Sequence, residues 1–463
     1  MKITVFFHKT LIVLGLGLAA STGCIDTAKA VSPPDQGDGA NHSYQIPGNW
    51  SLADAVVFAL ANNPGPRVAR DLVSARSAEV NGANSHLYPS LSLATEYSQT
   101  NRPMYSFGNI LNQGAFDDAI DFNDPGRTDA LVLEARIDYR LYDGGKRRAG
   151  IDQAQAAEVA ALRQREDVEQ LLAFEVVRSF HKIAQAREMA TVQQAEINAI
   201  AASLRVAQAR FEAGDLLQQD LLNLELQKER ATENHIRSIH TLRLAKRQFW
   251  NLLGFENNHP DTLPGYGPVQ KVPERLHPDN RNELKVMDAK IRQSEAMLRY
   301  AQGEQLPTID SFGQYQFEYG TVLGESGDSW LAGVRLEYSL YNGRKTDAQV
   351  AAAKAELTSM KSERERLQLA LNLDIQRAEI QYQQSMERLQ VTQKMVQVAQ
   401  KSTELSRARF QEGLILVSDL IDFEMRLTDA KARGAAARAD HQIAIANLRR
   451  AVGADQFPAT TSL

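Results

Sequence analysis

Three carboxylates that follow sharp turns are the residues whose type and spacing best suit a binding role. Asp220 and Asp419 each lie six residues after a glycine, and Asp422 lies about one helical turn beyond Asp419. A carboxylate at a helix start is favoured by the helix dipole, so a solvated helix-start role is the alternative for all three. If symmetry placed copies of the chain around an axis, each position would form a carboxylate ring that favours cations.

The residue types that perform bond chemistry are present but lack the spacing it requires. The nine histidines are scattered, and Cys24 is the one cysteine, so no disulfide within the chain and no cysteine-based metal cluster can form. There is no zinc-ligand spacing, no nucleophile elbow and no phosphate-cradling loop. We therefore expect no enzyme activity, no catalytic residue, no cofactor and no metal site.

The composition restricts the class of protein further. The 463 residues are 43% hydrophobic and carry a formal net charge of -5, a mild acidity that argues against a nucleic-acid partner. After the N-terminal segment, no stretch reaches 18 consecutive apolar residues. A membrane-spanning chain of this kind would need a closed β-barrel, and a soluble periplasmic protein is the alternative.

The first thirty residues predict an export signal, because two lysines accompany a short apolar run. Cleavage is expected either before Cys24, in a lipoprotein-like box at residues 21–24, or after Ala30. Lipidation of Cys24 would add only a marginal anchor, and a spare cysteine in a discarded peptide is the alternative. Residues 31–50 are rich in proline and glycine, which indicates an extended linker.

An internal duplication is the dominant feature of the chain. The Arg-Phe-x-x-Gly segment at residues 210–214 recurs at 409–413, and the segment at 139–144 recurs at 338–343. Both pairs are 199 residues apart. A constant offset over such a length predicts two copies of one structural unit.

The two copies differ in the length of one loop. Tyr88-Pro89-Ser90-Leu91 matches Leu306-Pro307-Thr308-Ile309 at an offset of 218, so the first copy carries 19 additional residues downstream. We place the first repeat at 51–254, a proline-rich linker between the repeats at 255–282, and the second repeat at 283–463.

Each copy contains two segments with the two-residue alternation of β-strands. The predicted strands span about 89–100, 129–142, 307–319 and 329–341. In the second of these, apolar residues from Leu131 to Leu141 alternate with charged residues from Glu134 to Arg140. A transmembrane strand needs about 9–11 residues of this pattern. An amphipathic hairpin on a soluble core is the alternative.

Each copy then contains two long helices. The predicted helices span 144–211, 217–253, 344–411 and 417–452. The first of each pair lacks proline, has no glycine over about 60 residues, and would reach roughly 90–100 Å. Apolar residues in 3–4 heptad spacing indicate coiled-coil packing, and Gly214 and Gly413 mark the reversals. A generic coiled-coil scaffold is the alternative.

Four strands cannot close a membrane barrel, and each unpaired backbone group in lipid costs several kcal/mol. Three chains would supply twelve strands and twelve long helical runs. The predicted fold is mainly α with a small β part. A duplicated strand-strand-long helix-helix unit would form, as a trimer, a 12-stranded transmembrane β-barrel continuous with a periplasmic α-helical barrel.

This layout resembles the TolC-type outer-membrane efflux proteins, the outer membrane factors, over about residues 48–463. The resemblance is carried by Leu52-x-x-Ala55-x-x-x-Ala59-Leu60-x-Asn62-Asn63-Pro64, by Tyr88-Pro89-Ser90-Leu91, by Leu141-Tyr142-Asp143-Gly144-Gly145-Lys146-Arg147 and by the two Arg-Phe-x-x-Gly turns. It implies a homotrimeric channel in the outer membrane of a Gram-negative bacterium, surrounded by outer-membrane lipid and open to the outside. It also implies docking to a periplasmic adaptor (membrane fusion) protein and an inner-membrane pump of RND or ABC type.

The resemblance also implies roles for particular residues. Asp419 and Asp422 match acidic residues of the family's narrow entrance, and we add Asp220 to this predicted constriction. Some members place an arginine of a closing latch where this chain has Ile415. The predicted adaptor-docking tip comprises Phe211, Gly214, Leu216, Phe410, Gly413, Leu414 and Ile415. Packing of these apolar residues against the neighbouring hairpin is the alternative.

The predicted function is a passive duct of a tripartite efflux or type I secretion system. A periplasmic coiled-coil scaffold or adaptor without a pore is the alternative. The loop at residues 100–127 is predicted to be the longer extracellular loop. Its four aspartates, Asp117, Asp118, Asp121 and Asp124, are expected to be solvated rather than to bind an ion.

Overall fold

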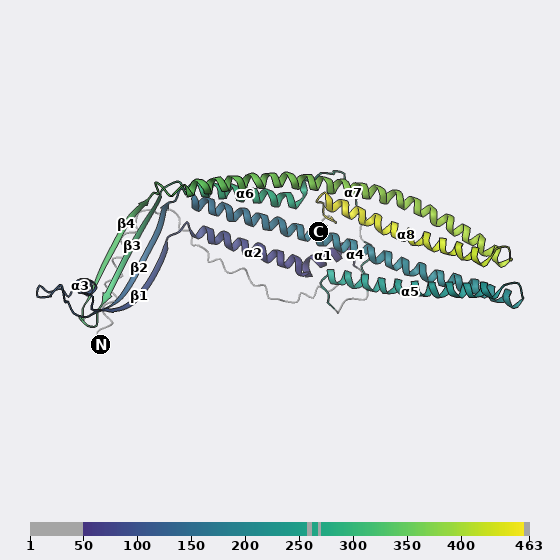
Figure 1. Cartoon of the computed structure of the whole chain (residues 1–463), viewed down its shortest axis with the longest axis horizontal. Coiled ribbons are helices and arrows are strands. Elements are labelled where there is room, and N and C mark those ends of the chain that lie inside the picture. The colour runs from purple at the N-terminus through teal and green to yellow at the C-terminus, as the bar shows by residue number, and fades with distance from the viewer. Residues whose placement is uncertain (1–49, 257–261, 267–269, 458–463) are drawn as a thin grey trace. The chain divides into compact units, whose positions relative to one another are not determined.

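The computed structural model describes residues 50–256, 262–266 and 270–457, which fall within the unit Gly48–Leu463. The elements in chain order (Figure 1) are α1 (Leu52–Asn62), α2 (Pro64–Ser85), β1 (Ser90–Thr100), α3 (Pro103–Asn112), β2 (Thr128–Tyr142), α4 (Lys146–Glu212), α5 (Gln218–Leu252), a 3-10 helix (Pro278–Asn280), α6 (Asn282–Gly303), β3 (Thr308–Tyr319), β4 (Ser326–Glu337), α7 (Lys345–Gln411) and α8 (Val417–Ala451). The predicted signal, Cys24 and nearly all of the linker at 31–50 lie outside the described residues.

The four strands form one antiparallel sheet in the order β1-β2-β3-β4. Its central pair joins β2 of the first copy to β3 of the second, so the strands of both copies form a single sheet. The sequence predicts that the last strand continues to about residue 341, but β4 ends at Glu337, opposite Thr308. Pro307 precedes Thr308 and has no amide hydrogen, so the ladder cannot continue there.

The pairing register gives the sheet one apolar face and one polar face. Residues opposite each other in a ladder share a face, as Leu131 does with Tyr97 and Tyr319. The apolar face carries the large exposed side chains Leu91, Leu93, Tyr97, Leu131, Leu133, Ile137, Phe317, Tyr319, Trp330, Val334 and Leu336. The polar face carries two ion pairs, Arg136–Asp138 and Arg140–Asp310, each at 2.7 Å.

The long helices form two antiparallel hairpins, α4–α5 and α7–α8, one from each copy. α4 and α7 each have 67 residues, and α5 and α8 each have 35. α4 packs against α1, α2, α5, α6 and α8, whereas α7 packs against α6, α8 and the 3-10 helix. Figure 1 shows that both hairpins turn at the end of the unit opposite the sheet.

The joint between β2 and α4 explains the Asp-Gly-Gly-Lys-Arg segment. The Asp143 carboxylate accepts hydrogen bonds from the amides of Gly145 (3.0 Å) and Arg147 (2.8 Å), which satisfies free donors at the helix start. Gly144 has a φ of 69°, and a Cβ there would lie 2.5 Å from the carbonyl oxygen of Gly303. Only glycine fits at this crossing of the joint and the end of α6.

The long loop of the first copy differs from its prediction, because it contains the helix α3. The four predicted solvated aspartates are exposed, and no cluster of three potential metal ligands occurs among the described residues. None of the helices within the described residues is both long and apolar enough to cross a bilayer. The duplicated strand-strand-long helix-helix unit is thus confirmed, whereas α3 and the short 3-10 helix Pro278–Asn280 were not predicted from the sequence.

Candidate functional site

The hairpin tips reverse the chain through the same turn in both copies. At the first tip the Gly214 amide bonds to the Phe211 carbonyl (2.9 Å) and the Asp215 amide to the Arg210 carbonyl (2.8 Å). Gly214 has a φ of 83°, and Gly413 at the second tip has a φ of 76°. This left-handed turn satisfies the last carbonyls of the helix and strongly favours glycine.

A hydrophobic core ties the two tips to each other. It contains Ile200, Ala207, Leu221, Leu224 and Ala231 from the first hairpin and Phe410, Val417 and Leu420 from the second. Leu216 and Ile415 are half-buried and pack against this core. Phe410 is only 2% exposed, so its ring supports the tip from within.

Arg210 adds a polar link between the tips. Its Nη1 donates a hydrogen bond to the Phe410 carbonyl oxygen at 3.1 Å. Its guanidinium carbon lies 5.4 Å from the centroid of the Phe410 ring, which is a cation–π distance. This chain has Ile415 where some family members have a latch arginine, but Arg210 of the first hairpin contacts the second tip.

The predicted docking residues divide into buried and exposed groups. Phe211 and Leu414 are exposed, as are Leu217 and Leu416 at the ends of the same turns. Leu216, Phe410 and Ile415 instead pack in the core described above. The sequence identifies the turn, but the division between its faces depends on contacts with the other hairpin.

The three predicted carboxylates lie in the first turns of the return helices. Asp419 and Asp422 are exposed on α8, and Asp220 is half-buried at the start of α5. Asp422 forms an ion pair with Arg426 at 2.6 Å, one turn further along. None of the ion pairs between described residues involves Asp220 or Asp419. The charges of these two carboxylates are therefore less neutralised than that of Asp422.

The seam between the hairpins contains buried carboxylates that no sequence pattern predicted. Glu424 on α8 is 4% exposed and pairs with Arg407 on α7, with Oε2 at 2.7 Å from Nη2. Glu196 on α4 is 7% exposed. Burial raises the pKa of the Glu196 carboxyl, and the nearby charge of Glu424 raises it further.

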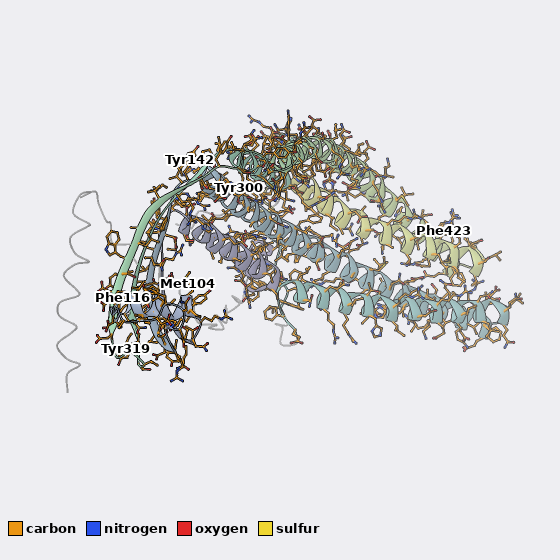
Figure 2. The ribbon with its side chains drawn as sticks, turned by 60° about the vertical axis from the view of Figure 1, so that its left-hand side comes forward. Met104, Phe116, Tyr142, Tyr300, Tyr319 and Phe423 are labelled. Atoms are coloured by element: carbon orange, nitrogen blue, oxygen red, sulfur yellow. The ribbon has the colours of Figure 1, made fainter. Side chains whose placement is uncertain are left out.

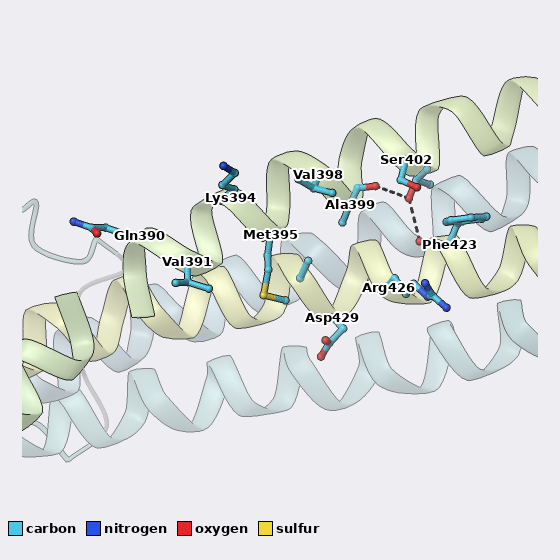
Figure 3. A pocket seen from close by; sticks show the side chains of 12 residues that line it. Gln390, Val391, Lys394, Met395, Val398, Ala399, Ser402, Phe423, Arg426 and Asp429 are labelled. Carbon is cyan, nitrogen blue, oxygen red and sulfur yellow. Dashed lines mark hydrogen bonds between the residues drawn. The ribbon is translucent and has the colours of Figure 1, made fainter. Parts of the chain in front are cut away.

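An apolar groove runs along the outside of the second hairpin. Val391, Met395 and Val398 of α7 and Phe423 of α8 line this groove, whose volume is about 750 Å³ (Figure 3). The Thr403 hydroxyl lies 2.8 Å from the Ala399 carbonyl oxygen and 3.0 Å from that of Phe423, which ties α7 to α8 beneath it. Val391, Met395 and Val398, which have heptad spacing in the sequence, thus line a groove that no other described residue fills.

A sheet with one apolar face, joined to two long helical hairpins with tight tips, defines the class of outer-membrane channel subunits. The chain matches the outer membrane efflux protein family over residues 56–254 and 277–454 and belongs to that family. It is therefore an outer-membrane efflux channel protein of a Gram-negative bacterium, with its helical part in the periplasm.

Individual relatives agree with this assignment. Protein CyaE of Bordetella pertussis is 26% identical over 345 residues, which cover 71% of this chain and 68% of that protein. The outer membrane protein TolC of Escherichia coli is 22% identical over 416 residues, 85% of this chain and 80% of that protein. The solved structure of the outer-membrane channel OprN matches with a TM-score of 0.76 at 17% identity. The match covers 88% of this chain and 91% of the OprN chain. The predicted family, the mainly α fold with its small β part and the location are confirmed.

Proposed function

We propose that three copies of this chain assemble into a passive duct that leads substrates from the periplasm or a pump to the exterior. Within the described residues, β1 and β4 have no further strand partner on their outer edges. Such edges are too costly in lipid to remain open. Twelve strands from three chains would close the sheet, with the apolar face toward lipid and the polar face toward a wet lumen.

The groove on the second hairpin supports the same assembly. Val391, Met395 and Val398 are separated by four and then three residues, which is heptad spacing, and all three are exposed. α5 carries a complementary exposed stripe made of Leu222, Leu226, Ile236 and Leu244. We expect α5 of a neighbouring copy to fill the groove, because heptad-spaced apolar side chains pack knobs into holes.

The exposed leucines of the tips support docking to a periplasmic adaptor protein. Leu217, Leu414 and Leu416 are exposed at turns, where a cluster of apolar side chains marks an interaction surface. Through the adaptor, the duct would connect to an inner-membrane pump of RND or ABC type, for efflux or type I secretion. Leu414→Ser with Leu416→Ser should abolish adaptor crosslinking while trimers persist, and unchanged crosslinking would contradict this docking site.

The exposed carboxylates of the tips support a cation-favouring entrance. In a trimer Asp419 and Asp422 would each form a ring of three, with Asp220 near the same level. We propose that Asp419 contributes most, since Arg426 partly neutralises Asp422. Asp419→Asn should lower the preference for cations over anions, whereas Asp71→Asn on the exposed side of α2 should not.

The duct is tested by planar-bilayer conductance of the purified outer-membrane protein. Heat-modifiable trimers with ohmic channels are expected. Recovery of the mature protein as a soluble monomer without conductance would instead favour the periplasmic scaffold or adaptor. We propose that the duct is passive and that the chain catalyses no reaction.

We also propose that residues 1–30 act as a cleaved export signal. Intact-mass measurement of the mature protein distinguishes the two predicted processing sites. A start at Cys24 carrying added acyl mass indicates lipidation, and a start at Val31 indicates ordinary cleavage after Ala30.

A further inference from the structure

The helix α3 lies in the part of the first copy that has no counterpart in the second. It begins at Pro103 in the first helical turn, where the missing amide hydrogen costs nothing, and its last turn leads into Gly114, with a φ of 72°. The inserted segment is therefore a folded helix with defined ends. Its position relative to the two faces of the sheet determines what it can do.

The start of α3 is bonded to the polar face of the sheet. The Ser106 hydroxyl donates to the Gly126 carbonyl oxygen at 2.6 Å and lies 3.1 Å from the Thr128 hydroxyl. The Asn109 amide donates to the same Thr128 hydroxyl at 3.0 Å. Thr128 is separated from Glu134 by six positions along β2, so both side chains are on the polar face.

The end of α3 is bonded to the same face. The Asn112 amide donates to the Glu318 carboxylate at 3.0 Å, and Glu318 pairs with Gly327 of β4 on the polar face. A Cβ at Gly327 would lie 2.0 Å from the Asn112 carbonyl oxygen, and one at Gly320 equally close to the Gln113 side chain. The two glycines make room for α3 directly over the polar face.

The other side chains of α3 are largely apolar; Ile110 is buried, and the loop that follows α3 adds both an aromatic cluster and the exposed aspartates Asp117, Asp118, Asp121 and Asp124. Phe107 packs with Phe122, with ring centroids 4.7 Å apart, and Phe116 completes the cluster. The exposed apolar residues of the segment are Met104, Tyr105, Leu111, Phe116 and Phe122. Figure 2 shows Met104 and Phe116 near Tyr319, at the end of the sheet away from the long helices.

We propose that α3 forms an outer constriction of the duct, in which three copies of this helix meet with their exposed apolar residues inside the mouth of the barrel. This inference rests on the proposed trimer with its polar face inward. A barrel of twelve strands about 4.8 Å apart and tilted by about 40° has a backbone diameter of roughly 24 Å. Three helices of about 10 Å diameter side by side occupy most of that width.

The constriction would act by excluding water. An apolar ring inside a pore opposes the passage of hydrated ions by dewetting, and displacement of the segment reopens the path. The duct would then have two restrictions. Carboxylates lie at the periplasmic entrance, whereas at the outer mouth the helix α3 itself presents the exposed apolar residues Met104, Tyr105 and Leu111, and the exposed aspartates are confined to the loop that follows it.

The first test removes the segment from the full-length protein. Thr100 and Thr128 are opposite each other in the β1–β2 ladder, so a short turn can replace residues 102–126 without disturbing the register. Single-channel conductance should rise by at least about two-fold, since the narrowest apolar section is gone. Val322→Ser, an exposed apolar position in the β3–β4 turn, serves as the control and should leave conductance unchanged.

A second variant keeps the inference testable if the shortened chain does not assemble. Met104→Asp with Leu111→Asp changes two exposed positions and should raise conductance by wetting the mouth. Val322→Asp is the matched control. Trimers whose conductance is unchanged by the aspartates would overturn the outer constriction, whereas absence of trimers and channels in the unmodified protein would instead overturn the proposed duct.

Discussion

The helices α4 and α7 occupy equivalent places in the two repeats but have different surroundings. They have the same length and begin 199 residues apart, yet α4 is covered by helices on several sides while α7 leaves one face open. His181 on α4 is 7% exposed, and its equivalent on α7, Ile380, is 63% exposed. An apolar residue is thus exposed on α7 where a polar one is buried on α4, as expected if the proposed neighbouring copy covers α7.

The largest expected effect comes from charging the open face of α7. Val391→Asp combined with Val398→Asp should abolish heat-modifiable trimers, because burying unpaired carboxylates at an interface costs several kcal/mol. The conservative pair Val391→Ile and Val398→Ile should retain them. Trimers of unaltered heat stability in the aspartate variant would show that the groove is not a subunit contact.

The second hairpin contains a buried ion pair that the first hairpin lacks. Glu424 and Arg407 correspond to exposed Glu225 and to Gln208 in the first copy. Glu424→Ala should destabilise the α7–α8 tip by about 2 kcal/mol, less than for a fully buried pair because Arg407 is partly exposed. Hydrogen exchange at the tip should accelerate roughly 30-fold for that change.

The matched variant Glu225→Ala provides the control for this measurement. Because Glu225 is exposed, exchange in the α4–α5 tip should change by less than about two-fold. Equal effects of the two substitutions would contradict the assigned difference between the hairpins.

A pH effect of intermediate size is expected at Glu196, whose equivalent in α7 is Met395. The folded-state pKa of Glu196 is raised, so its contribution to stability is present below the unfolded pKa of about 4.5 and is lost as pH rises through the folded value. Glu196→Gln should therefore protect the hairpin seam at neutral pH and change it little near pH 4. Hydrogen exchange of α4 at both pH values tests this, and a pH-independent difference would refute it.

The smallest effect concerns the two tip glycines. Alanine at either position must adopt a left-handed conformation, which costs roughly 1–2 kcal/mol. At Gly413 the new Cβ would also lie 3.2 Å from Arg210, whereas Gly214 has no neighbour within 4 Å. Gly413→Ala should thus lower the thermal stability of the tip slightly more than Gly214→Ala, and the reverse order would argue against the Arg210 contact.

Local periodicity was sufficient to predict most elements of this chain. The helix predicted at 344–411 is observed as Lys345–Gln411, and the strand predicted at about 89–100 as Ser90–Thr100. The glycine reversals were also predicted, since only glycine readily ends a helix in the left-handed conformation. These features depend on side-chain spacing and backbone sterics within a short segment, which the sequence contains in full.

The candidate site could be predicted only in part. The positions of the tip turns and of Asp419 follow from the duplication, but the burial of Phe410 and Glu424 does not. Burial depends on which residues a distant hairpin places opposite them, and the same Arg-Phe-x-x-Gly segment leaves Phe211 exposed in one copy and buries Phe410 in the other.

The repeated unit, its strands, its long helices and its turns follow from the amino-acid sequence, because each is specified by residues close together in the chain. The joining of the two copies through β2 and β3, the enclosure of α4 but not of α7, and the position of α3 on the polar face of the sheet are seen only in the folded chain. These outcomes require contacts between residues far apart in the chain, whose partners local spacing does not specify.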